Sequence, residues 1–535
     1  MNRRLFLRNT TASAISLGFG SAEDRLEQDS TDVLAQSMQR AAKCCLAWLN
    51  PDQYYFPTGG WEVAHDTGRW WDAMLRWEAA TQSMIPPLQE MAMLRNIEDL
   101  TANPGALLTN TARTGAAPQR IVTTPHNLRE SMLAYNALVR FRNSEWAREQ
   151  GHRLLKAIQD SLTEDGQLDQ QCLAKHVGVP LRDGRAPELV APGKWFNTTG
   201  TTGRTLEAIV WFGESTGDEL DAEVAGRIAR THLRQMISSD GHVRREILDN
   251  QHIGHNHSYL GMLRGLLLYG LWTGRKEYIH AVSNTYRRGL FGTNISESGW
   301  APHDLGKLRF PDAFGDPKGD HASCGDVAQL ALWLALRAGE EDLLDDVERL
   351  IRARLLPSQI ADQGNPRQYG AWGIYSHPFG RSAILDVIAA VLHSLVDFHQ
   401  HIVTTRPGGT ASVNLHFTTE TPSASVRVSR SDRGRLVVVS KRRQPLRVRV
   451  PGWAPRSTLR LTRQGRQLPL RWQGTYLIAG TLDANKAIEL EYELPERKSV
   501  EIMRLSGRKF ELSWRGDEVV SCSPEVPIYP AGNRE

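Results

Sequence analysis

The clearest structural signal in the chain is the run Leu260-Gly261-Met262-Leu263-Arg264-Gly265-Leu266-Leu267-Leu268-Tyr269-Gly270-Leu271. Leucines recur in it every three or four residues, at positions 260, 263, 266, 267 and 271. Side chains at this spacing lie on one face of an α-helix. The run therefore predicts an amphipathic helix whose leucine stripe packs into a core.

Similar stripes recur along most of the chain. We identify twelve helical segments, near residues 32–49, 66–82, 86–98, 126–141, 144–162, 203–216, 219–238, 256–273, 276–289, 324–338, 340–355 and 380–399. Connections between them alternate between short and long, as in an (α/α)6 toroid, where six inner helices line a cavity. An open helical solenoid is the alternative, but no sequence motif repeats at a fixed period. We expect a mainly α toroid over residues 23–403.

The pattern changes near Arg406. Apolar and polar residues then alternate in short runs at 412–417, 435–439, 446–450, 476–478 and 488–494, with turn residues between them. Alternation with a period of two is typical of half-buried strands. We expect residues 404–535 to form a C-terminal antiparallel β-sandwich.

Composition excludes several classes of protein. The 535 residues carry a formal net charge of +4, which argues against a dedicated nucleic-acid binder. Arginines are frequent in residues 404–473. They could form a solvated surface or bind an anionic glycan. Five cysteines do not make a disulfide framework, and no CxxC or HExxH spacing occurs. We predict neither a metal nor another cofactor.

The first residues resemble a twin-arginine export signal. Arg3-Arg4 is followed by Phe6-Leu7, a mildly apolar stretch over 10–20, and small residues at Ser21-Ala22. We expect residues 1–22 to be removed and the protein to act in the periplasm or outside the cell. No later run of 18 apolar residues predicts a transmembrane helix.

Three long connections, at 51–65, 180–202 and 291–323, are rich in Gly, Pro, Trp and His. They fall at alternate helix junctions, so they could meet at one mouth of the toroid. Tryptophan rings stack on sugar rings, although they also fill cores. The tryptophans of these connections, with the aromatic and polar residues near them in the sequence, predict a glycan-binding surface. Its members are Trp61, His65, Trp195, His255, Asn256, Tyr259, Trp300, His303, Trp372 and Tyr375.

Candidate catalytic groups occur in the same connections. Glycosidic cleavage needs one acid and a second group that attacks or activates water, and histidines are common acid–base groups. The candidates are Asp66, His257, Asp304, Asp312 and His377. Asp66 could instead be the N-cap of the helix that follows it.

Several motifs together resemble the β-L-arabinofuranosidase family of glycoside hydrolases. They are His65-Asp66-Thr67-Gly68-Arg69-Trp70-Trp71-Asp72, Gly254-His255, Asp312-Ala313-Phe314-Gly315, Ala322-Ser323-Cys324-Gly325 and Val450-Pro451-Gly452-Trp453-Ala454. The resemblance implies a toroid followed by β-sandwich structure, with Asp312 at the acid/base position. It also implies a zinc site and a cysteine nucleophile, but Ala322 replaces one ligand and Ser376-His377-Pro378 replaces the cysteine pair. That mechanism therefore does not carry over.

Three functions are compatible with these patterns. The first is a glycoside hydrolase that uses Asp312 as acid with a second carboxylate, Asp66, Asp304 or Asp326. The second is a polysaccharide lyase acting on uronate-containing glycans, with groups drawn from His255, Asn256, His257, Tyr259 and His377. The third is a glycan-binding protein without catalysis. In each case the partner is an oligo- or polysaccharide.

Overall fold

The computed structural model describes residues 32–60, 62–109, 125–178, 198–249, 254–291, 295–306, 311–375 and 380–529. Trp61, Trp195, His377 and the expected signal segment 1–22 lie outside these ranges. Among the helices described, none is both long enough and apolar enough to cross a membrane.

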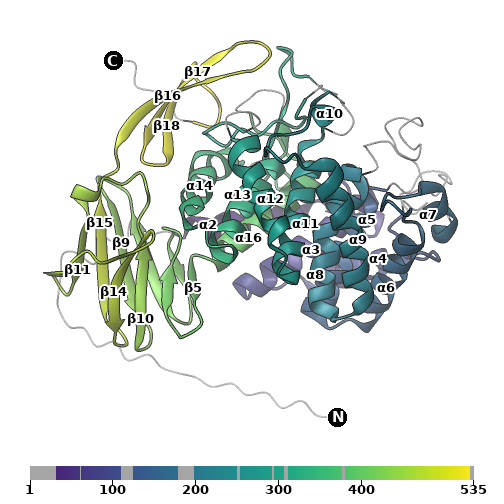
Figure 1. Cartoon of the computed structure of the whole chain (residues 1–535), viewed down its shortest axis with the longest axis horizontal. Coiled ribbons are helices and arrows are strands. Elements are labelled where there is room, and N and C mark those ends of the chain that lie inside the picture. The colour runs from purple at the N-terminus through teal and green to yellow at the C-terminus, as the bar shows by residue number, and fades with distance from the viewer. Residues whose placement is uncertain are drawn as a thin grey trace.

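Six helices form a closed inner ring (Figure 1). They are α3 (Val63–Thr81), α5 (Asn127–Arg142), α8 (Arg204–Thr216), α11 (Asn256–Thr273), α13 (His321–Arg337) and α16 (Leu385–Gln400). Each packs against the next in this order, and α16 packs against α3. The ring is therefore complete, as the alternating connections predicted.

Each inner helix has an outer partner. The outer helices are α2 (Val33–Ala47), α4 (Pro87–Leu100), α6 (Glu145–Asp160), α9 (Glu219–Met236), α12 (Lys276–Thr285) and α14 (Leu344–Leu350). They pack against α16, α3, α5, α8, α11 and α13 respectively. This arrangement confirms the (α/α)6 toroid. Three shorter helices lie in connections: α7 (Gln170–Val177), α10 (Arg245–Leu248) and α15 (Leu356–Ser358).

Helix α11 shows why the sequence folds this way. Leu260, Leu263, Leu266 and Leu267 are all fully buried, and burying one leucine contributes roughly 1.5–3 kcal/mol. Gly265 allows α8 to approach closely, because a Cβ there would lie 2.8 Å from the Cβ of Leu206. The expected single stripe is wrong, however: every residue of α11 from Asn256 to Gly270 is buried, because an inner helix packs against the ring and its outer partner on all sides.

Two sheets follow the toroid and pack as a β-sandwich, as predicted (Figure 1). The first has the order β13-β14-β10-β6-β5, with bounds β13 (Trp472–Gln473), β14 (Tyr476–Leu482), β10 (Gln444–Arg449), β6 (Ala411–Val413) and β5 (Val403–Thr405). The second has the order β12-β11-β15-β9-β8-β7, with bounds β12 (Arg466–Gln467), β11 (Arg460–Arg463), β15 (Ala487–Tyr492), β9 (Gly434–Ser440), β8 (Ala424–Ser429) and β7 (Thr419–Glu420). Neighbouring strands are antiparallel except β6 and β10, which are parallel.

A third sheet was not predicted as a separate unit. It consists of β16 (Glu496–Ile502), β17 (Lys509–Arg515) and β18 (Glu518–Ser523), all antiparallel. Its apolar side chains form a small cluster of their own with Ala353 of the toroid, and Trp300 packs against that cluster. Short two-stranded pairs, β1 (Leu49–Asn50) with β2 (Phe56–Pro57) and β3 (Gly319–Asp320) with β4 (Ile374–Tyr375), order the connections near the inner helices.

Candidate active site

A cavity of about 540 Å³ opens at the N-terminal ends of the inner helices. All six helices contribute side chains from their first turns or from the residue just before them, because every inner helix begins at this end of the ring. The described residues that line the cavity include His65, Arg69, His126, Arg204, His255, His257, Asp320, Ala322, Asp386 and Val387, together with His303 and Lys318 from a connection. Residues far apart in sequence thus face one shared space.

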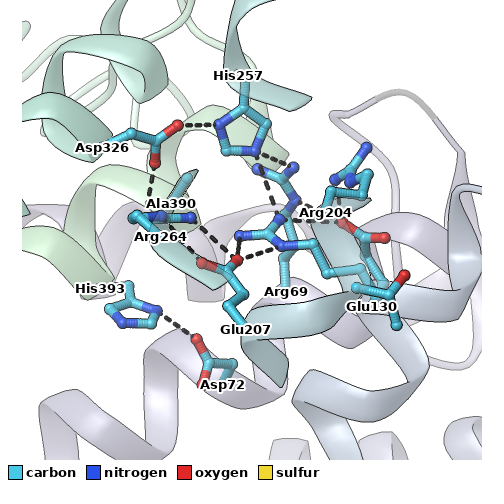
Figure 2. A network of polar contacts seen from close by, with 12 residues as sticks. Arg69, Asp72, Glu130, Arg204, Glu207, His257, Arg264, Asp326, Ala390 and His393 are labelled. Carbon is cyan, nitrogen blue, oxygen red and sulfur yellow. Dashed lines mark hydrogen bonds and ion pairs between the residues drawn. The ribbon is translucent and has the colours of Figure 1, made fainter. Parts of the chain in front are cut away.

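A buried network of charges adjoins this cavity, and Arg69, Arg204 and His257 belong to both (Figure 2). Glu130 on α5 accepts from Arg204 at 2.5 Å, from Arg69 at 3.2 Å and from Arg129 at 3.3 Å. Burial alone would raise the pKa of Glu130, but these three arginines lower it to about 2. Glu130 is therefore ionised and holds the guanidinium groups of α3, α5 and α8 together.

The network continues to the opposite side of the ring. Glu207 on α8 pairs with Arg129 at 2.5 Å and with Arg264 at 2.9 Å. Arg264 in turn pairs with Asp326 on α13 at 2.9 Å. Because the members come from five inner helices, the network links the ring beside the cavity.

His257 is part of this network. Its Nδ1 lies 2.5 Å from Oδ2 of Asp326, and its Nε2 lies 2.6 Å from Nη2 of Arg69. A guanidinium can only donate, so Nε2 is the acceptor and the proton is on Nδ1. Burial and the charge of Arg69 lower the pKa of His257. The sequence suggested an acid–base role, but both ring nitrogens are occupied, and the geometry favours a role in positioning Arg69.

Asp320 is held at the cavity by the start of α13. Its Oδ1 accepts from the N–H of Ala322 at 2.9 Å, as a helix N-cap, and its Oδ2 accepts from the hydroxyl of Ser323 at 2.7 Å. The residue is 2% exposed, and burial raises its pKa.

Asp386 faces the same cavity from the first turn of α16. Its side chain is 16% exposed, and Oδ1 has no hydrogen-bond partner within the described part of the chain. Burial raises the pKa of this carboxyl, Arg69 opposes the shift, and the charge of Asp320 adds to it. Sequence reasoning did not select Asp320 or Asp386. A carboxylate in the otherwise apolar run Ile384-Leu385-Asp386-Val387-Ile388 was the available signal.

The cavity receives only some of the residues that the sequence selected. His65, His255, His257 and His303 line it. The rings of His255 and His303 are 4.7 Å apart, and those of His126 and His255 are 6.4 Å apart and nearly parallel. His65 is kept neutral, since burial and nearby arginines lower its pKa.

The carboxylates that the sequence favoured lie elsewhere. Asp66 is not an N-cap, because α3 begins at Val63 and Asp66 lies within its first turn. The buried carboxylate of Asp66 packs against Gly60, which precedes the helix. Asp304 is buried beside His303, with 3.3 Å between Oδ1 and Nδ1. Asp66, Asp304 and Asp312 are not among the described residues that line the cavity.

Asp312 has structural partners instead. Its Oδ1 accepts from the N–H groups of Phe314 and Asp316, at 2.8 and 2.9 Å, and its Oδ2 accepts from Arg508 of β16–β17 at 3.1 Å. Arg508 also donates to Asp316 at 2.8 Å. The acid/base position implied by the resemblance is therefore used here to attach the third sheet to the toroid.

Several predicted sugar-binding residues belong to the core. Trp372 is fully buried and donates from Nε1 to the carbonyl of Leu355 at 2.8 Å. Asn256 donates to the carbonyl of Pro302 at 2.8 Å, and Tyr259 is buried with a raised pKa. Tyr375 is buried against His321, with ring centroids 4.5 Å apart. These four side chains are occupied by packing.

Trp300 lies in a different place. It lines a second cavity, of about 690 Å³, with Glu297, Glu501 and Val500 between the toroid and the third sheet. That cavity is not at the helix N-termini. Cys324 is also away from the first cavity, and burial raises its thiol pKa to about 12. Within the described ranges, no three His, Cys, Asp or Glu side chains are grouped so that they could hold a metal ion.

The fold matches solved glycoside hydrolase structures. A GH127 β-arabinofuranosidase superposes with a TM-score of 0.58 over 93% of this chain and 82% of its own, at 12% identity. A GH127 β-L-arabinofuranosidase from Geobacillus stearothermophilus T6 gives 0.54 over 93% and 81%, at 13% identity. A further glycoside hydrolase gives 0.56 over 85% and 77%, at 13% identity. No protein-family model and no curated protein matches the sequence. The chain thus has a divergent form of the fold seen in these enzymes.

Proposed function

We propose that the protein is a glycoside hydrolase whose reaction takes place in the cavity at the inner-helix N-termini. The observation that carries this proposal is the pair Asp320 and Asp386, which face that cavity from the adjacent helices α13 and α16. Most glycoside hydrolases cleave the glycosidic bond with two carboxyl groups in different protonation states. The toroid shared with solved glycoside hydrolases supports the same reading at the level of fold.

Asp386 is suited to be the general acid. A general acid must carry a proton near neutral pH and give it to the leaving oxygen. Burial favours the protonated form of Asp386, and its side chain, 16% exposed, lines the cavity. Its proton can therefore be directed at a bound sugar.

Asp320 is suited to the second role. The N–H of Ala322 and the hydroxyl of Ser323 both donate to it, and such hydrogen bonds favour a carboxylate. They also fix its orientation at the end of α13. Once Asp386 is protonated, Asp320 can ionise with one like charge fewer beside it, since Asp326 is then the only carboxylate that still raises its pKa. It then activates water or attacks the sugar carbon.

Arg69 and His257 complete this arrangement without a chemical step. Arg69 donates from Nη1 to the backbone carbonyl of Asp386 at 3.0 Å, and from Nη2 to His257. Its guanidinium therefore connects the start of α16 to α11. We propose that Arg69 and His257 fix the position of the Asp386 backbone relative to the other inner helices.

The lyase alternative has less support. A lyase needs a base beside the proton that it removes. Tyr259 is buried outside the cavity lining, and both nitrogens of His257 are engaged. Two of the residues expected to serve a lyase are therefore unavailable in this geometry.

The test is a screen of purified protein on plant and algal polysaccharides. It follows new reducing ends for hydrolysis and ultraviolet absorbance for the unsaturated product of a lyase. We expect reducing ends without that absorbance, and a loss of about 10²–10⁴-fold in turnover in Asp320→Asn and in Asp386→Asn. Asp432→Asn, in an exposed turn of the sandwich, is the matched control. Unchanged turnover in both cavity variants, or binding without turnover by the unmodified protein, would overturn the proposal.

A further inference from the structure

The charges around the cavity are unevenly distributed. The ring order is α3, α5, α8, α11, α13, α16, so α5 and α8 lie across the cavity from α13 and α16. Asp320 and Asp386 occupy the second pair of helices, whereas His126 and Arg204 stand at the start of the first pair. Arg204 therefore lies across the cavity from the two carboxyl groups, whereas Lys318, two residues before Asp320, lies on their side.

The buried network that adjoins the cavity is short of negative charge. It contains four arginines, Arg69, Arg129, Arg204 and Arg264, but three carboxylates, Glu130, Glu207 and Asp326. Within these seven residues, four positive charges against three negative ones leave an excess of one; Asp320 and Asp386 lie outside this set, at the other side of the cavity. Arg204, Arg69 and Arg129 all share the same Glu130 oxygen. An unbalanced buried charge is costly unless a ligand of opposite sign completes it.

Arg204 is where that excess reaches the cavity. It is 1% exposed and lines the cavity, and its Nε–H has no acceptor within the described residues. Burial and the neighbouring arginines lower its pKa to about 9, although Glu130 counteracts this. A carboxylate bound here would offset that charge and could accept the unused Nε–H. Guanidinium and carboxylate match in geometry as well as in charge.

Two further features of the cavity also favour an anionic ligand. Lys318 lines the cavity with no carboxylate partner in the part of the chain that the structure describes. The N-termini of six inner helices also converge there, and each carries the partial positive charge of its helix dipole. An anionic group is thus favoured over a neutral one from several directions.

We propose that the sugar unit bound in this cavity carries a carboxylate, as a uronic acid residue does, and that Arg204 and Lys318 recognise it. Arg204 stands at the start of α8 and Lys318 stands two residues before Asp320, so a sugar unit that contacts both spans the cavity. This inference rests on the proposed function for the ligand being a sugar, but recognition of the acid does not depend on turnover.

The experiment measures binding to the unmodified protein, because free sugars have no glycosidic bond that could be hydrolysed. Calorimetry compares glucuronate, galacturonate and mannuronate with glucose, galactose and mannose. We expect at least one acid to bind at least about 10-fold more tightly than its neutral counterpart. Arg204→Gln should remove that preference, and Lys318→Gln should reduce it. The Lys318 variant keeps the test valid if the buried Arg204 change prevents folding.

The outcomes separate this inference from the proposed function. If no acid binds more tightly than its neutral counterpart, or if the preference survives both changes, recognition of a carboxylate is wrong. If the acids bind as expected but polysaccharide turnover is the same in Asp320→Asn as in the unmodified protein, the assigned carboxylate pair is wrong and the inference stands.

Discussion

Nη2 of Arg69 lies 2.6 Å from Nε2 of His257, and Nδ1 of the same ring lies 2.5 Å from Asp326. The imidazole is therefore a neutral bridge between a guanidinium and a carboxylate (Figure 2). A histidine held in this way cannot exchange protons freely with a substrate. Its substitution should affect stability as well as activity.

We expect His257→Ala to lower the free energy of unfolding by about 2–4 kcal/mol, because it leaves two buried charged groups each short of a hydrogen bond. Urea denaturation measures this change. His280→Ala, at an exposed position of α12, is the matched control and should change stability little. The pH profile of kcat/KM in His257→Gln should keep the same pKa values as the unmodified protein. Loss of one limb of that profile would show that His257 is an acid or base after all.

Asp386 should control the alkaline limb of the activity profile. Its raised pKa keeps it protonated at pH values where an ordinary aspartate is ionised, and activity should fall as pH rises through that pKa. Asp386→Asn removes the acid, so a substrate with an activated aryl leaving group should recover turnover much more than the natural glycoside. Equal losses on both substrates would argue against the assignment.

Stability should fall on the acid side of neutrality. The pKa of Glu130 is about 2 in the folded protein and 4.5 ordinarily. Its contribution, on the order of 3 kcal/mol, is complete above pH 4.5 and is lost as pH falls toward 2. The lowered pKa values of His65 and His257 add a loss that begins as pH falls below 6.5. Denaturation between pH 7 and pH 3 tests this, and a constant free energy over that range would contradict it.

The third sheet should depend on Arg508. Replacing it with Met leaves the fully buried carboxylates of Asp312 and Asp316 without their cation, at a cost of about 2 kcal/mol. Hydrogen exchange should become faster over residues 311–317 and 496–523. Arg497→Met, whose partner Glu297 is exposed, is the control and should cost less than about 1 kcal/mol. Equal effects of the two changes would show that burial of the pair is unimportant.

Export should depend on the first residues. We expect Arg3→Lys combined with Arg4→Lys to retain the protein in the cytoplasm, because the twin-arginine pathway requires that pair. Fractionation of cells followed by immunoblotting measures this. Changing Arg8 alone to Lys is the control, and secretion that is unaffected by the double change would contradict the expectation.

The sequence by itself determined the helices, the toroid and the sandwich. The predicted segment 256–273 coincides with α11, and six of the twelve predicted segments overlap the helices of the ring, although the sequence did not say which six. The spacing of apolar residues is sufficient to locate the helices, although inner helices such as α11 and α13 are buried on every side rather than along one stripe. The third sheet escaped notice, since its packing partners Ala353 and Trp300 belong to the toroid rather than to neighbouring strands.

Only the tertiary structure decided which polar residues share the cavity. Asp320 and Asp386 come from different helices, and closure of the ring alone brings them to the same space. The sequence selected Asp312 and Trp372 because a carboxylate or an indole has the right chemistry for a glycan site. In the structure Arg508 binds the carboxylate of Asp312, and the carbonyl of Leu355 accepts from the indole of Trp372. Neither partner could be identified from the sequence, because each is brought into contact only by tertiary packing. A side chain's chemistry can be read from sequence, but its partners depend on how separate helices pack, and the partners decide whether it is free to act.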